Sequence, residues 1–359
     1  MTHKESNWLL FWTFLKIGST AFGGFMALIS VVQNYLVDRK KLLSDKEILD
    51  GISLATILPG PVAVNVVAYS GYRINGLSGA VVCATAVILP SFLLILLLSH
   101  LYFTWGEIPA VNNLFKGFIP AVAAIIVAAT INMGKKTLNG SAEYVVAIVA
   151  LLMLTLIGGF YSTIAIIIAS GLTGLLLFRK KSSDTDATSN GETQDKLRTL
   201  PVSILGFIAL PVAAMMLPLI NTGSIISAKL FITFAGMSVL LFGGGFVFIP
   251  MIQEIVVDSY GWVSNNEFID GIALGQITPG PILISATFIG YKVAGVIGAT
   301  AATIGIFLPP AMLMLFCTHF LDRLKKSDII NAALKGIRCG VIGMIAAAAI
   351  VVMQSAEQN

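Results

Sequence analysis

Long apolar runs without a charged residue recur along the whole chain, and they constrain its fold more than any other feature. Val81–Ser99 and Tyr144–Phe178 are two such runs. A helix of roughly 20 apolar residues matches the ~30 Å hydrocarbon core of a bilayer. Only 11% of the residues are charged, whereas soluble domains usually carry about 25%. The sequence therefore predicts an all-α, polytopic transmembrane helical bundle rather than a soluble enzyme.

One polar stretch interrupts the apolar segments. The segments expected in the membrane are 8–33, 51–72, 77–103, 112–132, 142–158, 160–178, 201–220, 228–252, 268–290, 294–320 and 330–353. Residues 179–199 are polar and lack aromatic side chains, which is typical of a flexible linker. Because Arg179, Lys180 and Lys181 directly follow an apolar segment, we expect this linker in the cytoplasm.

The chain carries an internal repeat at an offset of 220 residues, which becomes 219 after one deletion. The matched positions are Phe22-Gly23-Gly24 and Phe242-Gly243-Gly244, Ser44 and Ser264, Glu47 and Glu267, Asp50 and Asp270, Pro59-Gly60-Pro61 and Pro279-Gly280-Pro281, Gly71-Tyr72 and Gly290-Tyr291, and His100 and His319. Three units are expected. Residues 1–178 form an N-terminal transmembrane repeat with two extra helices, 179–199 the linker, and 200–359 a C-terminal repeat with one preceding helix.

The relative orientation of the two repeats depends on how many segments cross the membrane. If every segment spans, an odd spacing separates the repeats and their topology is inverted, as in many secondary transporters. If 51–72 and 268–290 are re-entrant, the same count makes the repeats parallel. Basic residues in the loops divide almost evenly between the two models. We expect two homologous repeats that are inverted, with broken or re-entrant Pro-Gly-Pro helices.

Each repeat has a Pro-Gly-Pro in a segment that is otherwise helical. Proline removes a backbone donor and clashes with the preceding turn, so these sequences predict a break in the helix. The half-helix after such a break begins with free N–H groups and a partial positive charge, which attract an anion. Breaks at matched positions of two repeats indicate a transport site. The alternative is a structural kink.

The residues expected to bind substrate are the paired glycines, the breaks, nearby polar side chains and the basic residue after each Gly-Tyr. They are Gly23, Gly24, Pro59, Gly60, Pro61, Asn65, Arg73, Gly243, Gly244, Thr278, Pro279, Gly280, Pro281, Ser285 and Lys292. The alternative role of the glycines is close helix packing. The alternative role of Arg73 and Lys292 is snorkelling, in which the long side chain extends to the membrane interface.

Four acidic residues precede the breaks and are candidate proton carriers: Glu47, Asp50, Glu267 and Asp270. A serine three residues before each glutamate gives the spacing of a capping box, which favours a capping role. The matched residues His100 and His319 are either pH-sensitive gates or packed at the interface, and we favour packing.

Several classes of function find no support in the sequence. There is no nucleotide-binding P-loop, no metal-binding spacing and no basic surface interleaved with aromatics that would indicate nucleic acid. Cys83, Cys317 and Cys339 lie in apolar segments without paired spacing. We therefore expect no cofactor, no metal and no catalytic residues.

The matched motifs resemble those of the chromate ion transporter (CHR) family in its long, two-domain form. They are Ala21–Gly24, Leu58–Asn65, Gly71–Ala80, Phe242–Gly245, Gly261–Pro281 and Gly290–Ala299. The resemblance implies chromate export across the cell (inner) membrane, and so chromate resistance. The repeats differ where Ser285 replaces Asn65, which argues against strictly symmetric roles.

Physical chemistry agrees with an outward movement of such an anion. Chromate is a dianion, and a negative interior drives each charge outward with ~2.3 kcal/mol per 100 mV. Proton coupling is an additional option. Sulfate has the same charge and shape, so a carrier for sulfate or another oxyanion is one alternative, and an intramembrane enzyme or a structural membrane protein is another. The expected partners are the small anion and the lipid bilayer, with a homodimer as a further option.

Overall fold

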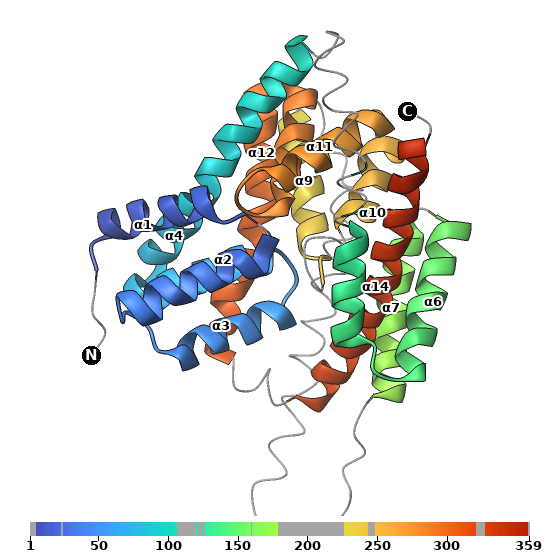
Figure 1. Cartoon of the computed structure of the whole chain (residues 1–359), viewed down its shortest axis with the longest axis horizontal. Helices are drawn as coiled ribbons and strands as arrows, with labels where there is room; N and C mark the ends of the chain where they lie inside the picture. Colours follow the sequence, from blue (N-terminus) through green and yellow to red (C-terminus); the bar gives the residue numbers. More distant parts are fainter. Residues whose placement is uncertain are drawn as a thin grey trace, which may run out of the picture.

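The computed structural model describes residues 5–22, 24–105, 120, 124, 126–158, 160–178, 226–242, 248–320 and 327–357. Every element in these ranges is a helix, which confirms the all-α prediction for the described part. The linker, the expected segment 201–220 and most of 112–132 lie outside it. In Figure 1 the first three helices gather on one side, and the helices between residues 126 and 177 lie on the other with the C-terminal helix.

The first expected segment, 8–33, is two helices, so the prediction of a single span is wrong. Helix α1 (Asn7–Thr20) ends before the glycine pair, and α2 (Gly24–Gln33) continues into the π-helix η1 (Asn34–Arg39). The hydroxyls of Thr13 and Tyr35 lie 3.1 Å apart across this break, so the two arms fold back on each other. An apolar run of this length suits one span or two half-length arms. Glycine is a poor helix former, so the glycine pair allows the run to divide into two arms.

The expected segment 228–252 is also divided. Helix α9 (Ile226–Ser238) ends before the second glycine group, and α10 (Phe248–Gln253) continues into the π-helix η4 (Glu254–Ser259). Residues 243–247 between them lie outside the described part.

A second hairpin has its turn at the first Pro-Gly-Pro. Helix α3 (Asp45–Ile57) begins with a complete capping box between Ser44 and Glu47, and α4 begins at Val62. Gly60, in the turn, has a φ of 108°. Midway along the arms Gly51 packs on the Tyr69 ring, since a Cβ at Gly51 would lie 2.6 Å from Tyr69 Cδ1. Thirteen residues of α3 extend about 20 Å, which is shorter than the hydrocarbon core.

The second half repeats this hairpin at matched positions. Helix α11 (Asn265–Ile277) starts with the capping box of Ser264 and Glu267, and the short 3-10 helix η5 (Ile282–Ile284) leads into α12 (Ser285–Cys317). Gly280 has a φ of 112°, and a Cβ at Gly271 would lie 2.6 Å from the Phe288 ring. The predicted capping role of both serine–glutamate pairs is confirmed.

The long helices α4 (Val62–Trp105) and α12 each consist of two arms. The chain leaves helical geometry at Asn75 and Gly76 in α4, and at the matched Ala294 and Gly295 in α12. Glycines bring the arms into backbone contact beyond each turn: a Cβ at Gly71 would lie 2.3 Å from Gly79 O, and one at Gly290 2.3 Å from Gly298 O. The second arms, 77–105 and 296–317, begin at these points.

The remaining described helices pack against one another. Residues 126–137 are helical, and α6 (Ser141–Leu156) and α7 (Phe160–Leu177) pack along α14 (Asp328–Glu357). Figure 1 shows α6, α7 and α14 side by side. Within the described residues, the stretches long and apolar enough to cross a membrane are Val62–Trp105, Ile282–Cys317 and Asp328–Ile350. These stretches agree with a multi-pass membrane protein.

Candidate functional site

The two Pro-Gly-Pro turns each contact the opposite half of the chain. The Gly60 N–H donates a hydrogen bond to Leu241 O (2.8 Å), and the Gly280 N–H donates one to Ala21 O (3.0 Å). Leu241 and Ala21 occupy matched positions just before the two glycine groups. The tip of each Pro-Gly-Pro hairpin is thus joined to the glycine-containing break of the other half. We call the two turns, together with Ala21 and Leu241, the central crossing.

The long helix of the opposite half also contacts each turn. A Cβ at Gly60 would lie 2.2 Å from Pro310 Cβ on α12, and a Cβ at Gly280 would lie 2.9 Å from Ser91 Oγ on α4. Ser91 and Pro310 are again matched positions. The contact at Gly60 leaves no room for a side chain and that at Gly280 leaves little, so packing favours glycine at both turns in addition to φ.

Buried polar groups surround the crossing. Asn65 lies on the first turn of α4 and is 0% exposed. Its Nδ2 donates to Pro59 O at 3.4 Å, and its Oδ1 has no hydrogen-bond partner. On the other side, the buried hydroxyls of Thr278 and Ser285 donate to Gly275 O and Ile282 O. The first turn of α4 also presents backbone N–H groups, which favour an anion.

The crossing brings together only some of the residues that the sequence proposed for substrate binding. Those at the turns or on the first turn after them are Pro59, Gly60, Pro61, Asn65, Thr278, Pro279, Gly280, Pro281 and Ser285. Gly24 is the first residue of α2, whereas Gly23, Gly243 and Gly244 lie outside the described residues.

Arg73 and Lys292 lie at the open bases of the hairpins, far from the turns. Arg73 Nη2 is 2.6 Å from Glu47 Oε1, and Lys292 Nζ is 2.7 Å from Glu267 Oε1. Twelve helical residues from Pro61 to Arg73 correspond to about 18 Å. In this structure the two cations do not lie at the breaks, because each has a glutamate partner at the hairpin base, and their role in substrate binding stays a prediction.

The same ion pairs fix the charge of the two glutamates. Burial raises the pKa of Glu47, but hydrogen bonds from Ser44 and Arg73 outweigh it, so the pKa lies below the ordinary glutamate value. Burial likewise raises the pKa of Glu267, and hydrogen bonds from Lys292 and Ser264 lower it further than burial raises it. Both groups are therefore held as carboxylates at neutral pH, which suits capping and ion pairing more than proton carriage.

The two aspartates differ in their surroundings. Asp270 is 8% exposed and accepts a 2.7 Å hydrogen bond from Tyr102 of the opposite half. Its counterpart Asp50 is half-buried. Asp270 is thus the most enclosed of the four predicted proton carriers.

The two histidines make reciprocal contacts with tyrosines of the opposite half. His100 Nδ1 is 2.9 Å from Tyr291 Oη, and the rings of His319 and Tyr72 are 6.3 Å apart in an edge-to-face arrangement. Each contact joins the far end of one long helix to the base of the other half's hairpin. The favoured prediction of packed histidines agrees with these contacts.

Two charged groups near the interior were missed as site residues. Arg338 on α14 donates from Nη2 to Thr56 O at 3.0 Å, beside the first Pro-Gly-Pro turn. Lys335 pairs at 2.7 Å with Glu143, which is only 5% exposed. An arginine inside a predicted membrane segment was the available signal for the first, but its contact with α3 spans 282 residues of sequence.

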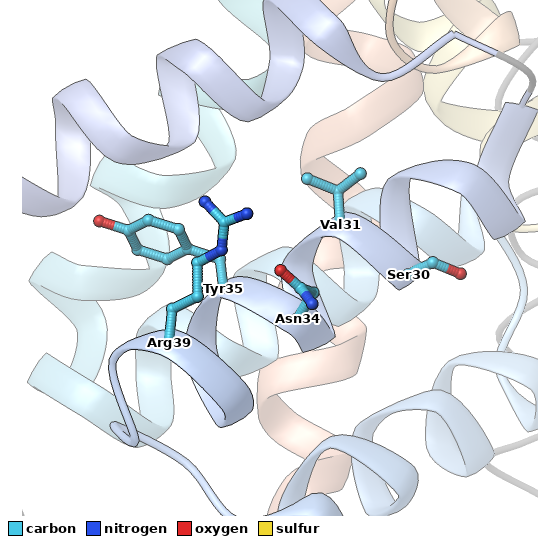
Figure 2. Close-up of a pocket in the computed structure, with 5 residues that line it drawn as sticks. All are labelled: Ser30, Val31, Asn34, Tyr35 and Arg39. Carbon is cyan, nitrogen blue, oxygen red and sulfur yellow. The ribbon is translucent and has the colours of Figure 1, made fainter.

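A separate cavity lies away from the crossing, on α2 and η1. It has a volume of about 330 Å³ and is lined by Ser30, Val31, Asn34, Tyr35 and Arg39. Figure 2 shows the Arg39 side chain extending alongside Tyr35. The crossing itself is closed in this structure, since Leu58, Val62 and Ala63 are all buried there.

Apolar helices, two hairpins with broken tips and a buried polar crossing between the halves define a polytopic membrane protein of the transporter class. Comparison with known proteins identifies the family. The chromate transporter family model matches residues 8–175 and 228–359, and the chain belongs to this family. Membership supports chromate transport, with an anion as the substrate and the bilayer as its setting.

Relatives of similar length support the assignment. The chain is 33% identical over 345 residues to the chromate transport protein of Pseudomonas aeruginosa, covering 95% of this chain and 80% of that one. It is 33% identical over 341 residues to an uncharacterized transporter, MJ0718, of Methanocaldococcus jannaschii, covering 95% and 83%. A probable chromate transport protein of Synechococcus elongatus is 31% identical over 339 residues, covering 94% and 82%. No solved structure matches the chain.

Proposed function

We propose that this chain is a secondary transporter that exports chromate from the cell, with the anion bound at the central crossing. The observation that carries the proposal is the reciprocal pair of backbone hydrogen bonds, Gly60 to Leu241 and Gly280 to Ala21. A transport site at the meeting point of two halves can open to either side when one half moves against the other. Helix starts and buried polar groups converge there, which suits a small anion.

We also propose that the two halves have inverted orientation. In support, the arm 77–105 starts at the base of the first hairpin and extends about 43 Å. Near its end His100 contacts Tyr291, at the base of the second-half hairpin. Hairpin bases at opposite ends of such an arm suit opposite membrane faces. With re-entrant hairpins, the sequence model gave parallel repeats because it counted 8–33 as one membrane crossing. If 8–33 is instead two arms that fold back on each other, one crossing fewer separates the repeats and their orientation is inverted.

Membrane potential is the proposed driving force. A dianion leaving a negative interior gains about 4.6 kcal/mol per 100 mV, so no nucleotide is needed. If protons are coupled to transport, Asp270 is the proposed carrier because it is enclosed and bonded to Tyr102 across the two halves. The cell (inner) membrane is the proposed location, and a homodimer stays a prediction.

Uptake of radiolabelled chromate into everted membrane vesicles tests the function. Export from cells corresponds to accumulation inside such vesicles, so we expect chain-dependent uptake that rises with an inside-positive potential. Vesicles without the chain are the control. Absence of chain-dependent uptake contradicts the proposal. Displacement of chromate by sulfate at equal or lower concentration would instead identify a general oxyanion carrier.

A further inference from the structure

Arg338 stands out among the charged groups of the interior because no acidic residue of the described part pairs with it. It lies on α14, which is among the stretches apolar enough to cross a membrane, and none of the ion pairs in the described part of the chain includes it. Its neighbour on the same helix face, Lys335, has a carboxylate partner in Glu143. An ionisable residue in a membrane segment is costly and usually marks a substrate or ion site.

The position of Arg338 places its charge at the first Pro-Gly-Pro turn. Its Nη2 donates to Thr56 O at 3.0 Å, and only residues 57–61 separate Thr56 from the start of α4. Arg338 therefore reaches the tip of the hairpin, where Arg73 and Lys292 do not.

Capping of α3 by itself does not account for this arginine. One donor satisfies the Thr56 carbonyl, whereas a guanidinium carries five N–H groups in a planar fork. The fork matches two oxygens of a tetrahedral oxyanion at once. Asn65, fully buried on the first turn of α4, lies at the same turn, and its Nδ2 donor has only a long 3.4 Å hydrogen bond to Pro59 O in the described structure. A cation without an acidic partner in the described structure, a helix start and a buried amide N–H donor thus lie at one turn.

The second Pro-Gly-Pro turn has no equivalent charge at the matched positions of the sequence. The position matched to Arg338 is Ile119, and the position matched to Thr56 is Gln276. Gln276 has a buried Nε2 without a hydrogen-bond partner in the described structure. Within the described residues the two turns therefore differ: one has a cation beside it and the other a neutral amide.

We propose that Arg338 is the cation that binds the transported dianion, in one site at the Pro59-Gly60-Pro61 turn rather than in two equivalent sites. This inference rests on the proposed function and makes it specific. The guanidinium holds two oxygens of the anion, and the start of α4 with Asn65 faces the others. At the second Pro-Gly-Pro turn, Gln276 contributes a neutral amide in place of a charge.

The test compares three purified variants in proteoliposomes with radiolabelled chromate. Arg338→Gln removes the charge but keeps an N–H donor for Thr56 O, and Arg338→Lys keeps the charge but loses the fork. Lys229→Gln removes a positive charge that contacts only the Tyr260 and Trp262 rings in the described structure, and it is the matched control. We expect Arg338→Gln to raise the KM for chromate at least about tenfold, Arg338→Lys to raise it several-fold with kcat largely kept, and the control to match the wild type.

The outcomes separate this inference from the function itself. A wild-type KM in Arg338→Gln overturns the inference and leaves chromate transport standing. If thermal unfolding in detergent shows that Arg338→Gln is not folded, Arg338→Lys decides, and an unchanged KM in that variant overturns the inference. Failure of the wild-type protein to move chromate overturns the proposed function instead.

Discussion

Substitution of Gly60 by alanine is the most direct perturbation of the central crossing. The added Cβ would lie 2.2 Å from Pro310 Cβ and 2.8 Å from Pro310 Cγ, well inside the 3.5–4.0 Å of favourable carbon contacts. The proline ring is rigid, and the Gly60 N–H is tied to Leu241 O. Relief of the clash therefore requires the turn to move away from α12 or that hydrogen bond to break.

Two costs contribute to the effect of Gly60→Ala. Overpacking of a closed contact costs about 1–3 kcal/mol, and a φ of 108° adds about 1–3 kcal/mol of backbone strain in any residue other than glycine. We expect a total loss of about 2–6 kcal/mol, or a displaced turn with lost transport.

Gly76→Ala is the matched control, because Gly76 has a φ of 65° and a Cβ there meets no atom within 4 Å. Its expected cost is only backbone strain of about 1–3 kcal/mol, because a φ of 65° with a ψ of −151° is a conformation essentially restricted to glycine. Apparent Tm in detergent and chromate uptake in vesicles are measured for both variants. Equal stability and equal uptake for Gly60→Ala and Gly76→Ala would refute the close packing of the crossing.

Two further predictions concern the hairpin bases. The glutamates Glu47 and Glu267 have pKa values lowered in the folded protein, so the ion pairs stabilise it above the ordinary glutamate pKa of about 4.3 and lose that effect as pH falls through the lower folded values. The double variant Glu47→Gln, Glu267→Gln should therefore have a lower apparent Tm than the wild type at pH 7. The loss of unfolding free energy should be less than about 1 kcal/mol per ion pair. A difference in Tm between variant and wild type that widens below pH 4 would contradict this reasoning. Single cysteines at Lys41 and Arg73 should react with an impermeant reagent from one membrane face and a cysteine at Lys292 from the other, whereas labelling of all three from the same face would exclude inverted halves. The native cysteines are buried, which keeps the background low.

Local sequence was sufficient where the physics is local. Proline removes a donor wherever it lies, so the breaks at Pro59 and Pro279 follow from the sequence alone. Serine three residues before glutamate satisfies the first N–H groups of a helix in the same way in any fold, and both capping boxes are present. The apolar runs likewise predict membrane helices, because the bilayer offers unpaired backbone groups no hydrogen-bond partners.

Hydropathy did not predict the structure where an apolar run of one length fits either a single span or two shorter arms. Segment 8–33 is long enough for one span, yet α1 and α2 fold back on each other. Both arrangements bury the same apolar side chains, so composition does not distinguish them. The choice depends on what the break at Ala21 contacts, and that partner is Gly280 in the other half.

The sequence by itself determined a membrane helical protein with two matched sets of helix breaks and caps, because each of these depends on residues within one helical turn of each other. Only the tertiary structure decided which breaks meet, that Arg73 and Lys292 pair with glutamates, and that Arg338 reaches Thr56. These outcomes depend on packing between segments that are 25 to 282 residues apart in sequence. The direction a chain takes after a broken helix is set by that packing, and no local preference encodes it.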